Sequence, residues 1–144
     1  MSKPSTIAEL TWTGALTFST AINGGASFTL DSAGAAGPSP VGALAAALAG
    51  CMSMDVAHIL TRGRHAFGAL TARLVGERQQ DDPHRFTRIT LHLVVQGDVP
   101  ADAVERAIAL SREKYCSVWH SMRQDIAFTT TFDVRSADAS RSDA

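Results

Sequence analysis

The 144-residue sequence is poor in aromatic residues and cysteine and has almost no surplus of charge. Aromatics make up 6% of it, there are two cysteines, and the formal net charge is −1. Without a basic excess, the chain is not expected to bind nucleic acid or an anionic membrane surface. The two cysteines do not form a C-x-x-C motif, the histidines are scattered, and no glycine-rich phosphate loop is present. We therefore expect no metal and no cofactor.

Long, strongly apolar segments are also lacking. The uncharged run Ser32–Met54 consists mostly of alanine and glycine, with two prolines, three serines and two leucines. A membrane-spanning helix needs about 20 strongly apolar residues, so this run is expected to form a buried core helix instead. The first residues do not have the charged head and apolar core of a signal peptide. These features predict a cytoplasmic protein with reduced cysteines.

The length predicts a single domain over residues 1–134. The segment 135–144, "RSADASRSDA", is small and polar and is expected to be a disordered tail. Alternating apolar residues and turn signals predict the strands. The N-terminal part is expected to form a hairpin around the "NGG" turn. The predicted strand regions are 8–22, 26–31, 68–78, 84–97 and 126–134.

Two helices complete the predicted α+β order ββαββαβ, with one strand more or fewer in the N-terminal segment. The first begins at Ser39 and Pro40, because serine caps helices and proline suits the first helical position, and it ends near Gly63. The second is expected to run without interruption over residues 100–122. Residues 41–54 of the first helix are small or apolar on every side, so the helix must be enclosed on every side. A homodimer with central helices packed together would achieve this, and Cys51 would then lie near the interface.

Three motifs in the sequence are similar to those of a known family. "PSP" at the start of the first helix, "AALAGCMSMDV" within it and "REKYCSV" in the second helix resemble the OsmC/Ohr family, named for osmotically inducible protein C and organic hydroperoxide resistance protein. The resemblance covers about Ile7 to Val134. It implies an α+β fold with antiparallel sheets and two long central helices, in which two chains intertwine as a homodimer.

The resemblance also implies an activity, the thiol-dependent reduction of organic hydroperoxides in oxidative stress defence. Cys51 matches the peroxidatic cysteine, which is oxidised to a sulfenic acid, and Cys116 matches the resolving cysteine, which forms a disulfide with it. An external dithiol or lipoyl-type reductant would restore both thiols.

One part of the family pattern is missing. Hydroperoxide-reducing members carry an arginine in the N-terminal β region and a glutamate just after the helix-opening proline, and this pair activates the thiol. Here Val41 and Gly42 follow the proline, and no lysine or arginine occurs between Lys3 and Arg62. Arg112 and Glu113 are the candidate thiolate-stabilising residues in their place. The alternative function is a catalytically weak dimer that acts as a redox sensor or binds small apolar or thiol-reactive ligands.

Overall fold

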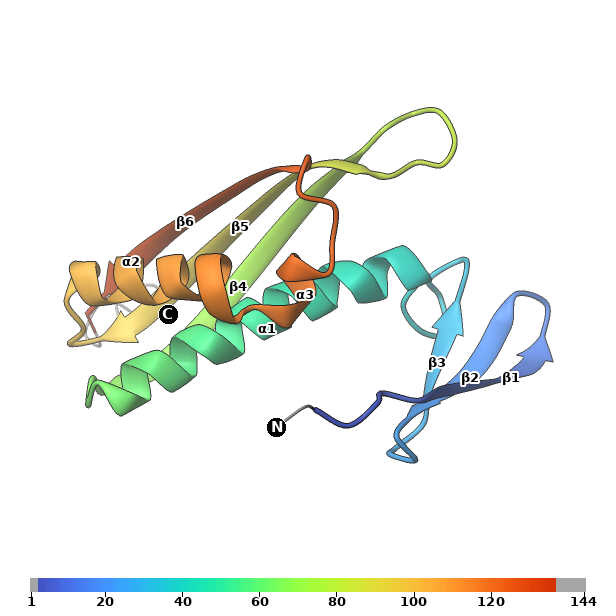
Figure 1. The fold of residues 1–144 in the computed structure, drawn as a ribbon, viewed down its shortest axis with the longest axis horizontal. Helices are drawn as coiled ribbons and strands as arrows, with labels where there is room; N and C mark the ends of the chain where they lie inside the picture. Colours follow the sequence, from blue (N-terminus) through green and yellow to red (C-terminus); the bar gives the residue numbers. More distant parts are fainter. Residues whose placement is uncertain (1–2, 137–144) are drawn as a thin grey trace. The chain divides into compact units, whose positions relative to one another are not determined.

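The computed structural model describes residues 3–136, so residues 137–144 of the predicted tail lie outside the described part of the chain. The chain divides into two compact units, residues 1–44 and 45–144. Figure 1 labels the elements. In chain order they are β1 (Ala8–Gly14), β2 (Thr17–Ile22), β3 (Phe28–Asp31), α1 (Pro40–Arg62), β4 (Phe67–Arg78), β5 (Phe86–Gly97), α2 (Ala101–Leu110), the π-helical turn η1 (Ser111–Tyr115), α3 (Ser117–His120) and β6 (Ala127–Arg135).

The first unit contains an antiparallel sheet with the strand order β1-β2-β3. Region 8–22, expected to be one strand, forms two, because the chain reverses at Ala15, whose φ of 43° is left-handed. The predicted "NGG" turn joins β2 to β3. Asn23 and Gly24 have positive φ there, and the Gly25 N–H donates to the Ile22 carbonyl over 2.9 Å.

The β1-β2-β3 sheet has one apolar face. Directly opposed residues of an antiparallel pair lie on the same face. Leu10 is opposite Thr20, Trp12 is opposite Phe18, and Phe18 is in turn opposite Leu30. This face is largely uncovered, since Trp12 is 65% exposed and Leu10 is 50% exposed.

Helix α1 begins where the sequence predicts. The Ser39 hydroxyl accepts a hydrogen bond from the Gly42 N–H over 3.0 Å, which caps the first turn. The buried residues lie four apart in a single stripe: Leu48, Met52, Val56 and Leu60. An 18-residue window of α1 has a mean hydropathy of 1.6 and is 22% buried. By length and composition alone this helix could cross a membrane, but core helices of soluble proteins meet the same criterion, and its apolar flanks need a cover of some kind.

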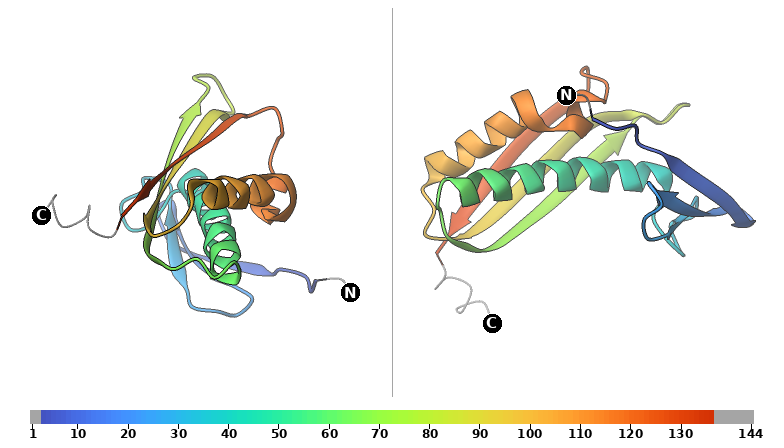
Figure 2. Two further views of the ribbon diagram at one scale, coloured as in Figure 1. Left: turned by 90° about the vertical axis from the view of Figure 1, so that its left-hand side faces the viewer. Right: turned by 60° about the horizontal axis from the view of Figure 1, so that its bottom comes forward.

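The second unit contains a sheet with the strand order β4-β5-β6. Strands β4 and β5 are antiparallel, whereas β5 and β6 are parallel, so this sheet is mixed and not purely antiparallel as expected. The predicted alternation in β5 is confirmed by a fully buried row, Ile89, Leu91, Leu93 and Val95, each 0% exposed. Both α1 and α2 lie on one face of this sheet (Figure 2). Because parallel neighbours need a crossover connection, the chain must pass over the sheet between β5 and β6, and α2 lies in that crossover.

Candidate functional site: a cysteine pair between α1 and the crossover

Cys51 lies in the middle of α1, next to the buried stripe of that helix. It precedes the fully buried Met52, and its own side chain is half-buried. A long helix with a regular apolar stripe fixes the position of each side chain along it. Cys51 is therefore presented from a rigid element at the edge of the core, where it is still reachable from outside the chain.

Cys116 lies at an interruption that the sequence did not predict. The expected continuous helix over residues 100–122 is wrong, because α2 ends at Leu110 and is followed by the π-helical turn. Cys116 itself is extended, with φ −74° and ψ 100°, and it caps the short helix α3. Its sulfur accepts a hydrogen bond from the Trp119 backbone N–H over 3.3 Å. This local bond offers the Trp119 N–H a partner other than the backbone carbonyl that it would bind in a continuous α-helix.

The structure brings the two thiols together. Both cysteines are free, and Cys116 is completely buried. Burial raises the pKa of Cys116 to about 11, because a thiolate is poorly solvated in the core. The bond from the Trp119 N–H opposes this shift, whereas the proximity of Cys51 adds to the raised pKa. Two sulfurs far apart in the sequence thus influence each other directly.

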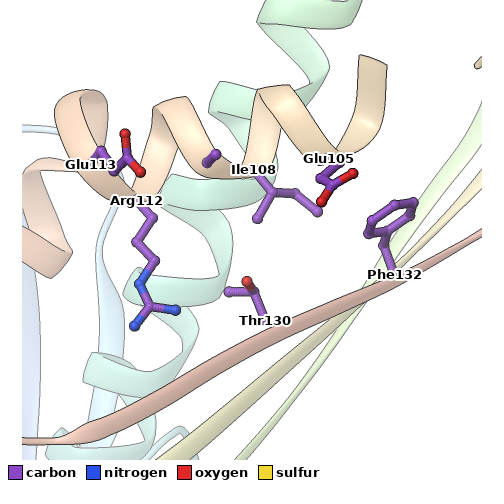
Figure 3. Close-up of a pocket in the computed structure, with 7 residues that line it drawn as sticks. Glu105, Ile108, Arg112, Glu113, Thr130 and Phe132 are labelled. Atoms are coloured by element: carbon purple, nitrogen blue, oxygen red, sulfur yellow. The ribbon is translucent and has the colours of Figure 1, made fainter. Parts of the chain in front are cut away.

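The Arg112 side chain reaches from η1 towards Thr130 on β6 (Figure 3). Its guanidinium carbon is 4.7 Å from the Phe128 ring centroid and 6.0 Å from that of Trp119, a cation–π arrangement. These two rings are in contact with each other in a tilted arrangement, with centroids 4.5 Å apart and an angle of 45° between their planes.

Arg112 also lines a pocket of about 390 Å³, as does Glu113 (Figure 3). The other lining residues are Glu105, Ile108, Ala109, Thr130 and Phe132. The thiolate-stabilising role of Arg112 and Glu113 stays a prediction.

Sequence reasoning missed a contact between Asp55 on α1 and Ser111 at the start of η1. The Ser111 hydroxyl donates to Asp55 Oδ2 over 2.7 Å, and Ser111 is completely buried. Asp55 follows Cys51 by four residues, so the two residues lie on the same side of α1. The available signal for this contact was Ser111 itself, a small polar residue at a buried position of the crossover segment.

No three or more histidine, cysteine, aspartate or glutamate residues within the described residues 3–136 come together in a group that could hold a metal ion.

Comparison with known proteins shows the family. A family model described as "OsmC-like protein" matches residues 32–131. Protein YhfA of Escherichia coli (strain K12) is 36% identical over 132 residues, which cover 90% of this chain and 98% of YhfA. The chain belongs to the OsmC-like family.

Solved structures agree with this membership. A hypothetical protein from Aquifex aeolicus VF5 is similar with a TM-score of 0.86 and 27% identity, over 93% of this chain and 98% of that one. An organic hydroperoxide resistance protein OsmC from Legionella pneumophila has a TM-score of 0.69 at 17% identity, over 93% of this chain and all (100%) of that chain. At this identity the second likeness concerns the fold alone. The α+β fold of the OsmC-like family is thus confirmed.

This OsmC-like chain departs from the hydroperoxide-reducing pattern at the start of α1. The positions after Pro40 are Val41 and Gly42, and they form the first turn that Ser39 caps. Neither side chain has an oxygen that could hold a guanidinium. An activating cation for Cys51 would have to come from another part of the chain or from a partner.

Proposed function

We propose that this OsmC-like protein reduces organic hydroperoxides with a cysteine pair, in which Cys51 is the peroxidatic residue and Cys116 the resolving residue. The observation that carries the proposal is the proximity of the two thiols at the junction of α1 and the crossover, close enough that Cys51 adds to the raised pKa of Cys116. A second observation supports the proposal, since solved proteins of the same fold are described as organic hydroperoxide resistance proteins.

The different surroundings of the two sulfurs support the division of roles. The thiolate is the nucleophile in cysteine chemistry. Cys116 is completely buried and its pKa is about 11, so at neutral pH it is held as a thiol and is a poor first nucleophile. Cys51 is half-buried on a rigid helix and open to a small substrate. We therefore assign the attack on the peroxide to Cys51.

The reaction then has three steps. The Cys51 thiolate attacks one oxygen of the hydroperoxide, the O–O bond breaks, and the alcohol leaves with a proton while the sulfur becomes a sulfenic acid. Cys116 attacks that sulfur, an S–S bond forms, and water leaves. An external dithiol, of lipoyl type or another, reduces the disulfide by thiol–disulfide exchange and is itself oxidised. The apolar character of α1 around Cys51 favours organic hydroperoxides over hydrogen peroxide.

We further propose that the working form is a homodimer in the cytoplasm. The uncovered apolar face of the β1-β2-β3 sheet and the low burial of α1 support a second copy as the cover. A reducing compartment would keep both cysteines as thiols until peroxide arrives.

One observation favours a second candidate function. Because Val41 and Gly42 stand where hydroperoxide-reducing members have the activating glutamate, the Cys51 thiolate lacks its usual support. The protein would then be a redox sensor, or would bind small apolar or thiol-reactive ligands, with slow peroxide chemistry.

The test uses the purified, reduced protein with cumene hydroperoxide or a fatty-acid hydroperoxide, and with hydrogen peroxide as the matched polar substrate. With dihydrolipoate present, we expect repeated turnover of the organic hydroperoxides, no turnover by Cys51→Ser, and accumulation of a sulfenic acid on Cys51 in Cys116→Ser. A single oxidation without turnover would support the sensor instead. If peroxide leaves Cys51 a free thiol, the peroxidase proposal is wrong.

A further inference from the structure

Ser111 joins the two cysteine-bearing elements by two different hydrogen bonds. Its hydroxyl donates to Asp55 Oδ2 over 2.7 Å, and its carbonyl accepts from the Cys116 N–H over 2.8 Å. Asp55 lies one helical turn beyond Cys51 on α1. A continuous path therefore runs from the helix of Cys51 through Asp55 and Ser111 to the backbone of Cys116.

The first of these bonds has the features of a strong one. Ser111 is completely buried and Asp55 is partly buried, so water competes weakly for the hydroxyl and the carboxylate. A hydrogen bond to an ionised carboxylate is roughly twice as strong as one between neutral groups. The bond also spans 56 positions of the sequence, which makes it a tertiary restraint and not a local turn.

The second bond closes the π-helical turn Ser111–Tyr115, in which the Cys116 N–H bonds five residues back instead of four. Such turns are rare and are frequently found at functional sites. The sequence pattern favours an ordinary α-helix through this segment, as the predicted range 100–122 shows. A shift of one residue in an α-helix rotates a side chain by about 100° around the axis. In that alternative Cys116 would leave the position where it interacts with Cys51.

We propose that Asp55 and Ser111 are positioning residues that hold the π-helical turn in place and thereby keep Cys116 within reach of Cys51. The inference rests on the proposed function, in which Cys116 resolves the oxidised Cys51. It assigns Asp55 to the closing of the disulfide and not to the attack on the peroxide.

The experiment measures the equilibrium between the protein dithiol and its disulfide in mixtures of oxidised and reduced dithiothreitol. In this exchange the two cysteines are oxidised while the dithiothreitol disulfide is reduced, so no peroxide is needed. Asp55→Asn and Asp55→Ala both remove the charge, but only Asn keeps an oxygen that can accept from Ser111. Ser111→Ala removes the donor and keeps the charge. Asp102→Ala, which removes an exposed carboxylate at the start of α2, is the matched control.

We expect the disulfide equilibrium constant to fall about 10-fold or more in Asp55→Ala and Ser111→Ala. Asp55→Asn should lie between Asp55→Ala and wild type, because it keeps an acceptor oxygen but loses the charge. Asp102→Ala should stay near wild type, and the double variant Asp55→Ala/Ser111→Ala should be no worse than either single variant. In a Cys116→Ser background, Asp55→Ala and Asp55→Asn should form the Cys51 sulfenic acid at the same rate. A merely structural role would not give this pattern.

Equal equilibrium constants for Asp55→Ala and Asp55→Asn would overturn the inference, as would an unchanged constant in Ser111→Ala. If Ser111→Ala does not fold, the comparison of the two Asp55 variants decides the matter alone. A wild-type protein that fails to turn over hydroperoxides, but closes a disulfide that depends on Asp55 and Ser111, would refute the proposed function and support this inference. A wild-type protein that closes no disulfide would overturn both.

Discussion

The β1-β2-β3 sheet and the β4-β5-β6 sheet each have three strands and one apolar face, yet they differ in how much of that face is covered. In the second sheet the alternate residues of β5, from Ile89 through Leu91 and Leu93 to Val95, are completely buried. Helices α1 and α2 lie on one face of this sheet (Figure 2). In the first sheet Trp12 and Leu10 of β1 are at least half exposed. Large exposed apolar patches mark interaction surfaces in soluble proteins. The apolar face of the second sheet is covered by helices of the same chain, whereas that of the first sheet is exposed as an interaction surface would be.

The largest expected difference between the sheets concerns a buried and an exposed leucine. Leu91→Ala in β5 should lower the free energy of unfolding by about 2–5 kcal/mol at every protein concentration, because it leaves a cavity in the closed core. Leu10→Ala in β1 should cost less than about 1 kcal/mol in dilute protein and more when a dimer forms. Urea unfolding at two protein concentrations measures both. An equal cost for both variants in dilute protein would remove the contrast between the sheets.

The next prediction tests what covers the first sheet. Trp12→Glu places a charge on the apolar face and should weaken the proposed dimer about 30-fold or more, the cost of losing a central interface anchor. Thr11→Glu is the matched control, since neighbouring residues of a strand point to opposite faces. Sedimentation velocity distinguishes monomer from dimer. If Trp12→Glu stays as dimeric as wild type, the second copy does not cover this face.

A smaller effect on the free energy of unfolding is expected at alkaline pH, and it arises from Cys116 in the second unit. Burial, with a further contribution from Cys51, raises the pKa of Cys116 from 9.0 to about 11. A group with a raised folded-state pKa stabilises fully below its unfolded pKa and loses that contribution as pH rises through the folded one. The free energy of unfolding, measured with urea under reducing conditions, should therefore fall between about pH 9 and 11 in wild type. Persistence of the same slope in Cys116→Ala would contradict this.

The smallest effect is expected in the first unit at acid pH. Backbone N–H bonds from Ala36, Ala33 and Ala35 lower the pKa of Asp31 below 3.8. Its contribution to stability is then present above the unfolded pKa and is lost as pH falls through the lower folded value. The melting temperature of Asp31→Asn should change less than that of wild type as the pH falls below about 4. Asp102→Asn serves as the control and should follow wild type.

Most of the fold could be predicted because its signals are local. The alternation in β5 and the Ser39–Pro40 start of α1 both follow from neighbouring residues. The division of region 8–22 into β1 and β2 was not located, because the turn between them uses Ala15 in a left-handed conformation, which alanine seldom adopts. Local pattern reasoning has no access to such a position.

The candidate site could be predicted only in part. The prediction that Cys51 and Cys116 act together came from the family motifs, since their spacing carries no information on distance. The interruption before Cys116 could not be predicted, because it coincides with a contact between Asp55 and Ser111, which are far apart in the sequence. Local propensity favours the uninterrupted helix, and tertiary contacts override it.

The two tryptophans differ as the two units do, one being exposed and the other buried. Trp12 is exposed in the first, while in the second the Trp119 backbone N–H binds the Cys116 sulfur and its ring packs against Phe128. Replacing Trp12 with phenylalanine would leave a single indole, on the residue whose N–H binds the Cys116 sulfur. Its fluorescence would then report the opening and closing of the disulfide in real time, without any added dye.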